Sequence, residues 1–191
     1  MNAREHMPNF VTIVISALLV MSCLLPGMIP LTRVPETPMP TLEKNADTVI
    51  EILTGQDWYT LQSLAQEQYI EEDFAGPGTL IFTVNITDDK PTYFNYGRCA
   101  VDEETLRQNF EHIRVRLYFN EDELGDDVVH NLSFTSPDNL LCLDFGVLFS
   151  EWSPGEYKLK AVATFDEKIN DGLADYEAGD YIFEYNVIVE K

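Results

Sequence analysis

Two stretches near the end of the chain decide the fold: Gly155-Glu-Tyr-Lys-Leu-Lys-Ala-Val-Ala-Thr-Phe165 and Gly179-Asp-Tyr-Ile-Phe-Glu-Tyr-Asn-Val-Ile-Val189. In both, apolar or aromatic residues alternate with polar ones, and successive side chains of a strand point to opposite faces. Each stretch therefore has one face suited to a core and one suited to water. We expect two strands joined by an acidic loop. The residues expected on the core faces are Tyr157, Leu159, Ala161, Ala163, Phe165, Tyr181, Phe183, Tyr185, Val187 and Val189.

The composition predicts a packed domain with a strongly acidic surface. The chain has 191 residues, of which 45% are hydrophobic, and this is ample for one ordinary domain. Its formal net charge is −21. Because Arg4 and Arg33 cancel Glu5 and Glu36, the whole excess of acid lies after Pro40. Such a surface repels phosphate backbones, so we expect no nucleic-acid partner.

The N-terminal residues 1–31 contain a long apolar run, with no charged residue between Glu5 and Arg33. A run of this kind after a short polar start is an export signal or a membrane helix. Three interpretations stay open: a retained transmembrane anchor, a lipoprotein signal lipidated at Cys23, and a conventional cleaved signal peptide. Val20-Met-Ser-Cys23 resembles the bacterial lipobox, although Met21 stands where a small or β-branched residue is usual. All three place the remaining chain on the extracytoplasmic side of a cell membrane.

Two further segments separate this run from the domain. Residues 32–41 are rich in proline, which predicts an extended tether. Residues 42–75 carry apolar side chains at helical spacing, which predicts two short helices, the first capped by Thr41 and the second by Asp57. Trp58 falls on the apolar face of the second helix, where packing is the expectation and ligand stacking the alternative.

Residues 76–191 predict an all-β fold. The apolar period changes to two after residue 78, and turn signals recur at short intervals. About seven strands behind two short helices are typical of an antiparallel β-sandwich. Residues 79–99 predict a hairpin, 102–110 one further short helix, and 113–119 an amphipathic strand. The strand ends within Leu140–Phe149 stay open.

The stretch Glu177-Ala-Gly-Asp-Tyr181-Ile-Phe183 adds a resemblance at the level of fold. It is similar to the approach to the penultimate strand in the immunoglobulin-like and fibronectin-type superfamily. This resemblance implies an immunoglobulin-like sandwich in which Tyr181 forms the tyrosine corner. Phe183 stands where that superfamily often has a cysteine, so the usual disulfide between the two sheets is not expected.

Two cysteines remain once Cys23 is assigned to the export segment. An even pair in an exported domain predicts a disulfide between Cys99 and Cys142. The alternatives are two buried thiols, or a cysteine nucleophile with His112 as its base.

The acidic loop between the two final strands is a candidate calcium site, because hard cations take several oxygen ligands from such loops. Its spacing does not fit the EF-hand pattern, and the alternative is turn chemistry with solvated acids. No other cofactor is expected. The candidate ligands are Asp166, Asn170, Asp171, Asp175 and Glu177.

No hydrolase or nucleotide-binding motif is present: Gly-x-Ser-x-Gly, His-Glu-x-x-His and a phosphate-binding glycine loop are all missing from the sequence. We therefore predict a non-catalytic binding or structural module, anchored through its N-terminal segment at the bacterial cell surface. Tyr93, Tyr96 and Tyr118 are candidates to contact a surface protein or a carbohydrate, with packing as the alternative. The other functions left open are an exported enzyme or enzyme-associated module, and a calcium-stabilised adhesion domain.

Overall fold

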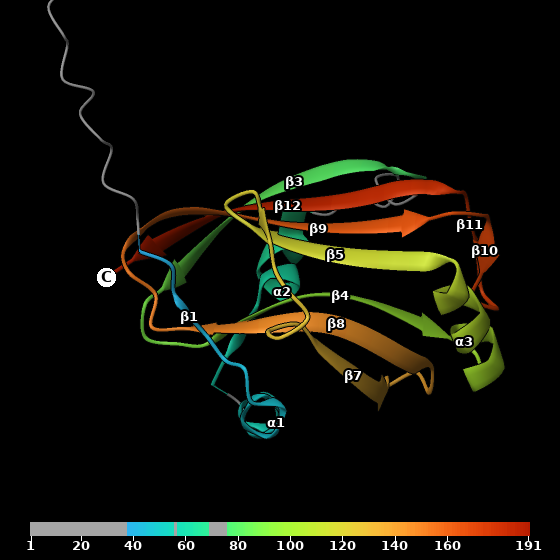
Figure 1. Ribbon diagram of the computed structural model, residues 1–191, viewed down its shortest axis with the longest axis horizontal. Helices are drawn as coiled ribbons and strands as arrows, with labels where there is room; N and C mark the ends of the chain where they lie inside the picture. The colour runs from blue at the N-terminus through green and yellow to red at the C-terminus, as the bar shows by residue number, and fades with distance from the viewer. Residues whose placement is uncertain (1–37, 56, 69–75) are drawn as a thin grey trace, which may run out of the picture. The chain divides into compact units, whose positions relative to one another are not determined.

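The computed structural model describes residues 38–55, 57–68 and 76–191, which lie within one compact unit, Pro35–Lys191. In this unit two β-sheets face each other, with short helices at their margins (Figure 1). The prediction of a β-sandwich is thus confirmed.

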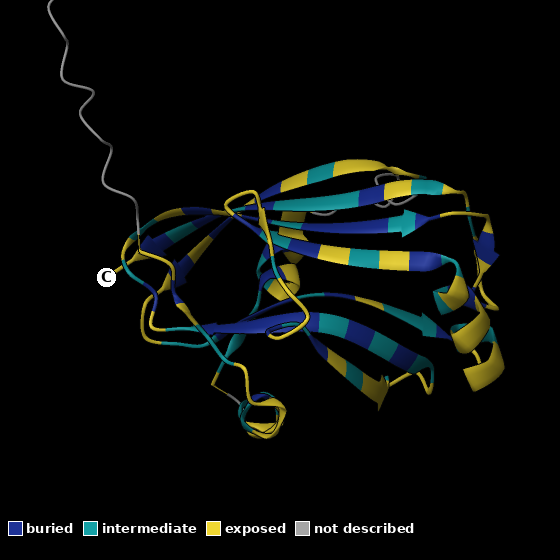
Figure 2. Ribbon diagram, viewed as in Figure 1, coloured by how far each residue is buried: buried dark blue, intermediate teal, exposed yellow. Residues whose placement is uncertain are grey.

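The predicted C-terminal strands form the centre of one sheet. They are β9 (Gly155–Phe165) and β12 (Gly179–Glu190), and they pair antiparallel along the whole of β9. All the expected core residues of both strands are buried except Phe183, which is half-buried. In β9 Val162 is buried as well, so this strand is dark blue over much of its length in Figure 2. The sheet, called the β12 sheet below, has the order β3–β12–β9–β5–β6. Its other strands are β3 (Gly78–Thr87), β5 (Ile113–Phe119) and β6 (Asp122–Glu123).

The second sheet, called the β8 sheet, is centred on an antiparallel pair. The pair consists of β8 (Leu141–Ser150) and β4 (Thr92–Ala100). Along the other edge of β8 lie β7 (His130–Thr135) and, at the opposite end, β1 (Thr41–Leu42). The short strand β2 (Tyr59–Thr60) runs parallel to β4.

Aromatic side chains from the two sheets fill the space between them. The ring of Phe119 on β5 lies 5.5 Å from that of Phe149 on β8, and Phe94 on β4 lies 5.9 Å from Tyr185 on β12. Phe94 and Phe149 are completely buried. Such ring pairs add about 0.5–1.5 kcal/mol each beyond the apolar area that they bury. The core is therefore built as a set of contacts between sheets.

The strand order is that of an immunoglobulin-like sandwich. In that fold, strands B, E and D lie in one sheet and strands C, F and G in the other. Here β4, β8 and β7 take the first set of places, and β5, β9 and β12 take the second. The first long strand, β3, lies at the edge of the β12 sheet, parallel to β12.

This position of β3 corrects two predictions. Residues 79–99 do not form a hairpin, since β3 and β4 lie in different sheets, and the sheets are mixed because β3–β12 and β2–β4 are parallel. The physical reason is that a period of two specifies which face of a strand is buried but not which strand lies beside it. The turn at residues 88–91 carries the chain from one sheet to the other.

The tyrosine corner also differs from the one that the resemblance implied. The Tyr157 hydroxyl, at the start of β9, donates to the carbonyl oxygen of Ser153 at 2.7 Å. The Tyr181 hydroxyl, at the start of β12, donates to the carbonyl oxygen of Glu177 at 3.0 Å. Because β9 holds the place of the penultimate strand, the corner belongs to Tyr157, and Tyr181 repeats its hydrogen bond one strand later.

The described residues form three α-helices, and the first two begin later than predicted. Helix α1 (Ala46–Thr54) is capped by Asn45, because Thr41 and Leu42 pair with β8 as β1. Helix α2 (Leu61–Ala65) is capped by Thr60 in place of Asp57, and α3 (Glu103–Glu111) is capped by Asp102 as an acidic helix start predicts. Figure 1 shows α1 on the side of the β8 sheet away from the β12 sheet and α2 between the sheets.

Helix α2 closes the side of the sandwich between β3 and β4. Its Leu61 and Ala65 are buried in the core, and a one-turn 3₁₀ helix, η1 (Gln66–Gln68), follows it. The Gln68 side-chain amide bonds both the carbonyl oxygen of Thr83, at 2.8 Å, and the amide of Thr83, at 3.1 Å. It therefore occupies the backbone groups of β3 much as a neighbouring strand would.

The predicted membrane or signal segment, with Cys23 and most of the tether, lies outside the described residues. Within residues 38–55, 57–68 and 76–191, no helix has the length and hydrophobicity needed to cross a membrane.

Cys99 and Cys142 form a disulfide, as predicted. They face each other on the neighbouring strands β4 and β8, so the bond ties one sheet to itself. In antibody-type domains the corresponding bond joins the two sheets.

Removing this bond with the double substitution Cys99→Ala/Cys142→Ala is expected to lower the free energy of unfolding by about 4 kcal/mol, because the bond closes a loop of 43 residues. Urea unfolding measures the change. A reductant should destabilise the natural chain by a similar amount and leave the double variant unaffected. Equal stability of the two chains would contradict the entropic contribution.

Candidate binding site

The outer face of the β8 sheet, which is the face turned away from the β12 sheet, carries an unusual floor. On β4 this face presents Tyr93, Asn95 and Gly97, opposite Leu148, Gly146 and Asp144 of β8. A methyl group on Gly146 would overlap the Tyr93 ring, and one on Gly97 would lie 2.6 Å from Oδ1 of Asp144. The Tyr93 ring therefore lies across Gly146, and the Asp144 carboxyl lies over Gly97. Two missing side chains make room for two polar groups.

Asp144 is a buried carboxyl in this floor. Its side chain is 4% exposed, and its Oδ1 accepts a hydrogen bond of 2.8 Å from Nδ2 of Asn95. Burial raises the pKa of the Asp144 carboxyl, while the Asn95 amide partly opposes the rise by stabilising the charged form. Carboxyls with raised pKa values in concave sites are frequent features of functional sites.

The hydroxyl of Tyr93 is the second polar group of the floor. It is fully shielded from water, and no described atom forms a hydrogen bond with it. Burial, and then the nearby Asp144 carboxylate, raise the pKa of Tyr93. The hydroxyl lies close enough to the Asp144 carboxyl for the contact to raise the pKa of Tyr93 and to lower that of Asp144, yet the two groups do not reach the geometry of a normal hydrogen bond. A buried hydroxyl without a partner costs about 1–3 kcal/mol, which makes it a feature in need of a reason.

Apolar side chains from three elements surround this floor and form a pocket of about 660 Å³, called the outer pocket below. Helix α1 contributes Ile50 and Leu53, and β7 contributes Leu132 and Phe134. Trp58 stands edge-on to Tyr93, with ring centroids 6.2 Å apart, and donates its indole N–H to the carbonyl oxygen of Gly55 at 3.1 Å. Ile50 and Phe134 are about half exposed at the rim.

The size and lining of the outer pocket suit a ligand. Binding sites for small groups have volumes of about 300–1,000 Å³, apolar walls and a few polar groups that fix orientation. The outer pocket has that volume, with Asp144, Asn95 and the Tyr93 hydroxyl at its base. The described residues that line it include no histidine, cysteine, lysine or arginine.

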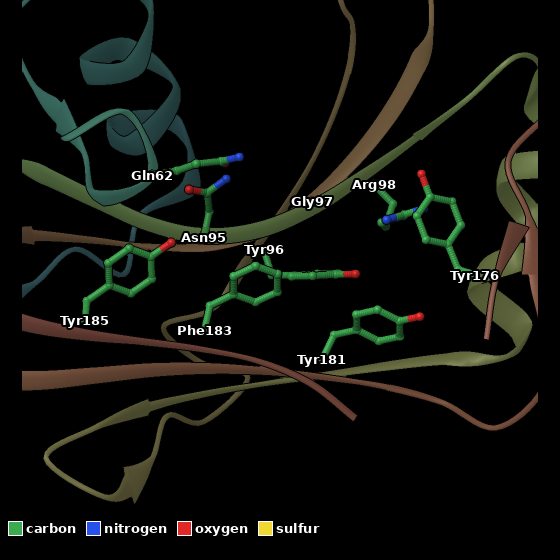
Figure 3. A pocket seen from close by; sticks show the side chains of 9 residues that line it. All are labelled: Gln62, Asn95, Tyr96, Gly97, Arg98, Tyr176, Tyr181, Phe183 and Tyr185. Carbon is green, nitrogen blue, oxygen red and sulfur yellow. The ribbon is translucent and has the colours of Figure 1, made fainter. Parts of the chain in front are cut away.

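A smaller cavity of about 200 Å³ lies between the sheets, where Tyr181, Phe183 and Tyr185 of β12 point toward β4 (Figure 3). Its charged group, Arg98, is already engaged: the guanidinium stacks 3.7 Å from the Tyr176 ring centroid and bonds Asp171 at 3.3 Å. Because of its size and its paired charge, this cavity is a weaker candidate than the outer pocket.

The acids predicted as calcium ligands are placed around a small hairpin of β10 (Ile169–Asn170) and β11 (Asp175–Tyr176). Asp166 bonds His112 at 2.9 Å, and Lys168 lies 3.2 Å from Asp175 and 3.0 Å from Glu177.

The other two predicted ligands are also engaged: Asn170 donates to Asp175 at 2.7 Å, and Asp171 accepts from the backbone and from Arg98. In the described part of the chain, no group of three or more His, Cys, Asp or Glu side chains is disposed to hold a metal ion. Calcium binding by this loop stays a prediction.

Of the other residues that the sequence analysis named as candidates, some pack within the fold and others line the outer pocket. Since Cys99 and Cys142 are joined to each other, neither is a thiol that His112 could activate. The hydrogen bond between His112 and Asp166 raises the pKa of the His112 imidazole. Tyr96 is buried and Tyr118 half-buried, whereas Tyr93 and Trp58 both line the outer pocket. Asp144 was missed. The signal that could have found it is a single acid inside the apolar run Leu140–Phe149.

Comparison with known proteins gives little further information. No protein-family model matches the sequence, and no curated protein matches it. The chain is similar to the cysteine protease inhibitor EhICP2 from Entamoeba histolytica, with a TM-score of 0.35 and 9% identity over 71% of this chain and 100% of that one. It is similar to PbICP-C, solved in complex with falcipain-2, with a TM-score of 0.36 and 12% identity over the same shares. The sandwich fold of this chain is identified by its strand order.

The substitution Asp144→Asn is expected to stabilise the protein at neutral pH. Burial raises the folded-state pKa of Asp144 above its unfolded value of about 4. Below that pH the carboxyl is protonated in both states, so it does not lower the free energy of unfolding of the natural chain. The natural chain loses stability as the pH rises through the folded-state pKa. The Asn variant has no such loss, so its advantage should grow from about pH 4 upward. Unfolding at a series of pH values tests this, with the exposed Asp138→Asn as control; parallel curves for Asp144→Asn and the natural chain would contradict it.

The substitution Gly146→Ala is expected to cost about 1–3 kcal/mol, since its methyl group would overlap the Tyr93 ring. The cost should shrink in a Tyr93→Ala background, because the overlap is then gone. Gly78→Ala provides the matched control, as no atom lies within 4 Å of the added methyl there. Thermal unfolding of the four variants measures the coupling; additive costs would show that Tyr93 does not lie over Gly146.

Proposed function

We propose that this chain is a non-catalytic binding domain whose outer pocket takes an apolar group with a cationic end from a partner protein. The observation that carries the proposal is the unpartnered Tyr93 hydroxyl beside the buried Asp144 at the base of an apolar pocket. An occupant with a hydrogen-bonding end would satisfy the hydroxyl and neutralise the carboxylate. Its apolar stem would cover Trp58 and Leu53.

The charge of the region supports a cationic end. No Lys or Arg occurs between Arg116 and Lys158, a range that contains β7, β8 and their flanking loops. Lys44 reaches this region from the segment before α1, but it is paired with Asp127 at 2.6 Å. An ion pair or charged hydrogen bond to Asp144 in a partly buried pocket gains more than it would at an open surface.

The proposal keeps the surface location predicted from the sequence. A domain that binds a partner outside the cytoplasm agrees with the apolar run before Arg33 and the proline-rich tether that follows it. Cell fractionation with labelled fatty acid distinguishes the versions: label on Cys23 favours the lipoprotein, membrane retention without label favours the helical anchor. Recovery of the whole chain in the cytoplasm would overturn the location.

Three small probes test the pocket: 4-isopropylbenzylamine, 4-isopropylbenzyl alcohol and 4-isopropylbenzoate. They share an apolar body and differ in the charge of the head. We expect the amine to bind at least about tenfold more tightly than the benzoate, since hydrogen bonds to charged groups contribute about 1.5–3 kcal/mol. Titrations followed by the NMR signals of the Trp58 indole N–H and the Asn95 amide measure the affinities.

Two variants sharpen this test. Asp144→Asn should remove the preference for the amine while leaving the alcohol unaffected, and Trp58→Ala should weaken all three probes. Trp152→Phe serves as the control for Trp58, because Trp152 lies in the core between the sheets. Equal binding of the three probes, or NMR shifts remote from Trp58, would reject the outer pocket as a binding site.

A further inference from the structure

The outermost strand of the β8 sheet has a free edge. Strand β7 pairs with β8 on one side, and no described residue pairs with its other side (Figure 1). The amide of Ser136 bonds the carbonyl oxygen of Leu140 at 2.9 Å, which fixes the phase of the antiparallel ladder. By the alternation of that ladder, the backbone groups of Asn131, Ser133 and Thr135 point toward the free edge. This is a row of donors and acceptors without described partners.

We propose that an extended, basic segment of a partner protein adds to the β8 sheet as a new strand along the free edge of β7. The inference rests on the proposed function only where it places one arginine side chain of the partner in the outer pocket. The pairing itself depends on the backbone of β7, so the two proposals can fail separately.

Nothing in β7 guards this edge. Sheet edges in soluble proteins are commonly protected by lysine, proline, a bulge or a covering segment. The sequence of β7 is His130-Asn-Leu-Ser-Phe-Thr135, which contains no Asp, Glu, Lys or Arg, no proline and no glycine. Other edges of this sandwich are covered in part: Gln68 occupies the backbone of Thr83 on β3, and β6 pairs with Tyr118 and Phe119 of β5. On β7, by contrast, no described strand or side chain of this kind pairs with the outer edge.

Charge decides between the possible occupants. Asp126 and Asp127 precede β7, Asp138 follows it, and no Lys or Arg occurs between Arg116 and Lys158. A second copy of the chain would bring the same acidic surface against this one, at a net charge of −21 for each chain. A basic strand meets no such repulsion. Charge complementarity therefore favours a cationic partner over self-association.

The side chains of β7 connect the edge to the outer pocket. Leu132 lies opposite Asp144, and Phe134, which is 52% exposed, lies opposite Cys142. Neighbouring strands are about 4.8 Å apart, so a strand added to β7 lies about 10 Å from β8. An arginine on the outer face of that strand would extend over Leu132 toward Asp144. Backbone pairing and one inserted side chain would thus act together, as in other cases of strand addition.

The test uses the peptide acetyl-Thr-Arg-Val-Arg-Val-Arg-Thr-amide and the full chain in a mild nonionic detergent. Two further peptides carry backbone N-methyl groups, one on the three arginines and the other on the two valines. Because alternate N–H groups of a strand face its neighbour, only one of the two patterns blocks pairing with β7. We expect one methylated peptide to bind at least about tenfold more weakly and the other to bind like the parent peptide. Calorimetry measures the three affinities.

Equal binding by the two methylated peptides would mean attraction by charge alone and would overturn strand addition. A glutamate version of the parent peptide should not bind, and tight binding by it would overturn the basic partner. On the protein side, Ser133→Pro removes an outward N–H and should weaken the parent peptide, while Ser133→Ala keeps that N–H and should not. The peptide series decides the matter should Ser133→Pro fail to fold.

Other results separate this inference from the proposed function. If 4-isopropylbenzylamine binds at Trp58 but the two N-methylated peptides bind equally, the outer pocket is supported as a binding site and strand addition is rejected. If the two N-methylated peptides differ in affinity but the amine does not bind, strand addition is supported and the outer pocket is rejected as a binding site. A dimer of the natural chain in sedimentation, abolished by Ser133→Pro, would identify a second copy as the occupant and overturn the basic partner.

Discussion

The pairing of β9 with β12 is the interaction on which the rest of the structure depends. Their ladder runs from Gly155 to Phe165 without interruption, and both strands turn aromatic and aliphatic side chains toward the opposite sheet. Each strand also begins with a tyrosine that bonds a carbonyl oxygen four residues earlier, which fixes the entry of the chain into the sheet. Strands β3 and β5 then add to the two outer edges of this pair. The β8 sheet is placed by the aromatic contacts that it makes with them.

The central role of the β9–β12 pair explains which parts of the fold were predictable from the sequence. The inward residues of β9 and β12 follow from a period of two, because burial alone decides which face of a strand is apolar. The disulfide follows from the parity of the cysteines in a chain whose N-terminal segment predicts export. The neighbour of β3 does not follow, since its alternation is the same whether it pairs with β4 or with β12. Nor does the start of α1, because Thr41 and Leu42 suit a strand as well as a helix.

The outer pocket was less predictable for a related reason. Its polar groups come from β4 and β8, and its walls from α1, Trp58 and β7, which are distant in the sequence. Only the register of β4 against β8 brings Gly97 opposite Asp144 and Asn95 opposite Gly146. The pocket is also built from features that cost stability, namely a buried carboxyl and a hydroxyl without a partner. Sites that must bind a ligand often retain such costs, while positions selected only for packing do not.

The parallel pairing of β3 with β12 has a mechanical consequence. The pair matches residues 78–87 with residues 181–190, so the first residue of β3 and the last of β12 lie at opposite ends of one ladder. A force that pulls these two ends apart acts along the strands, and all the backbone hydrogen bonds of the ladder resist it together. An antiparallel hairpin pulled from its two open ends would instead break one bond after another. Tension between those two points would therefore load the sandwich in shear, the direction in which a sheet is strongest.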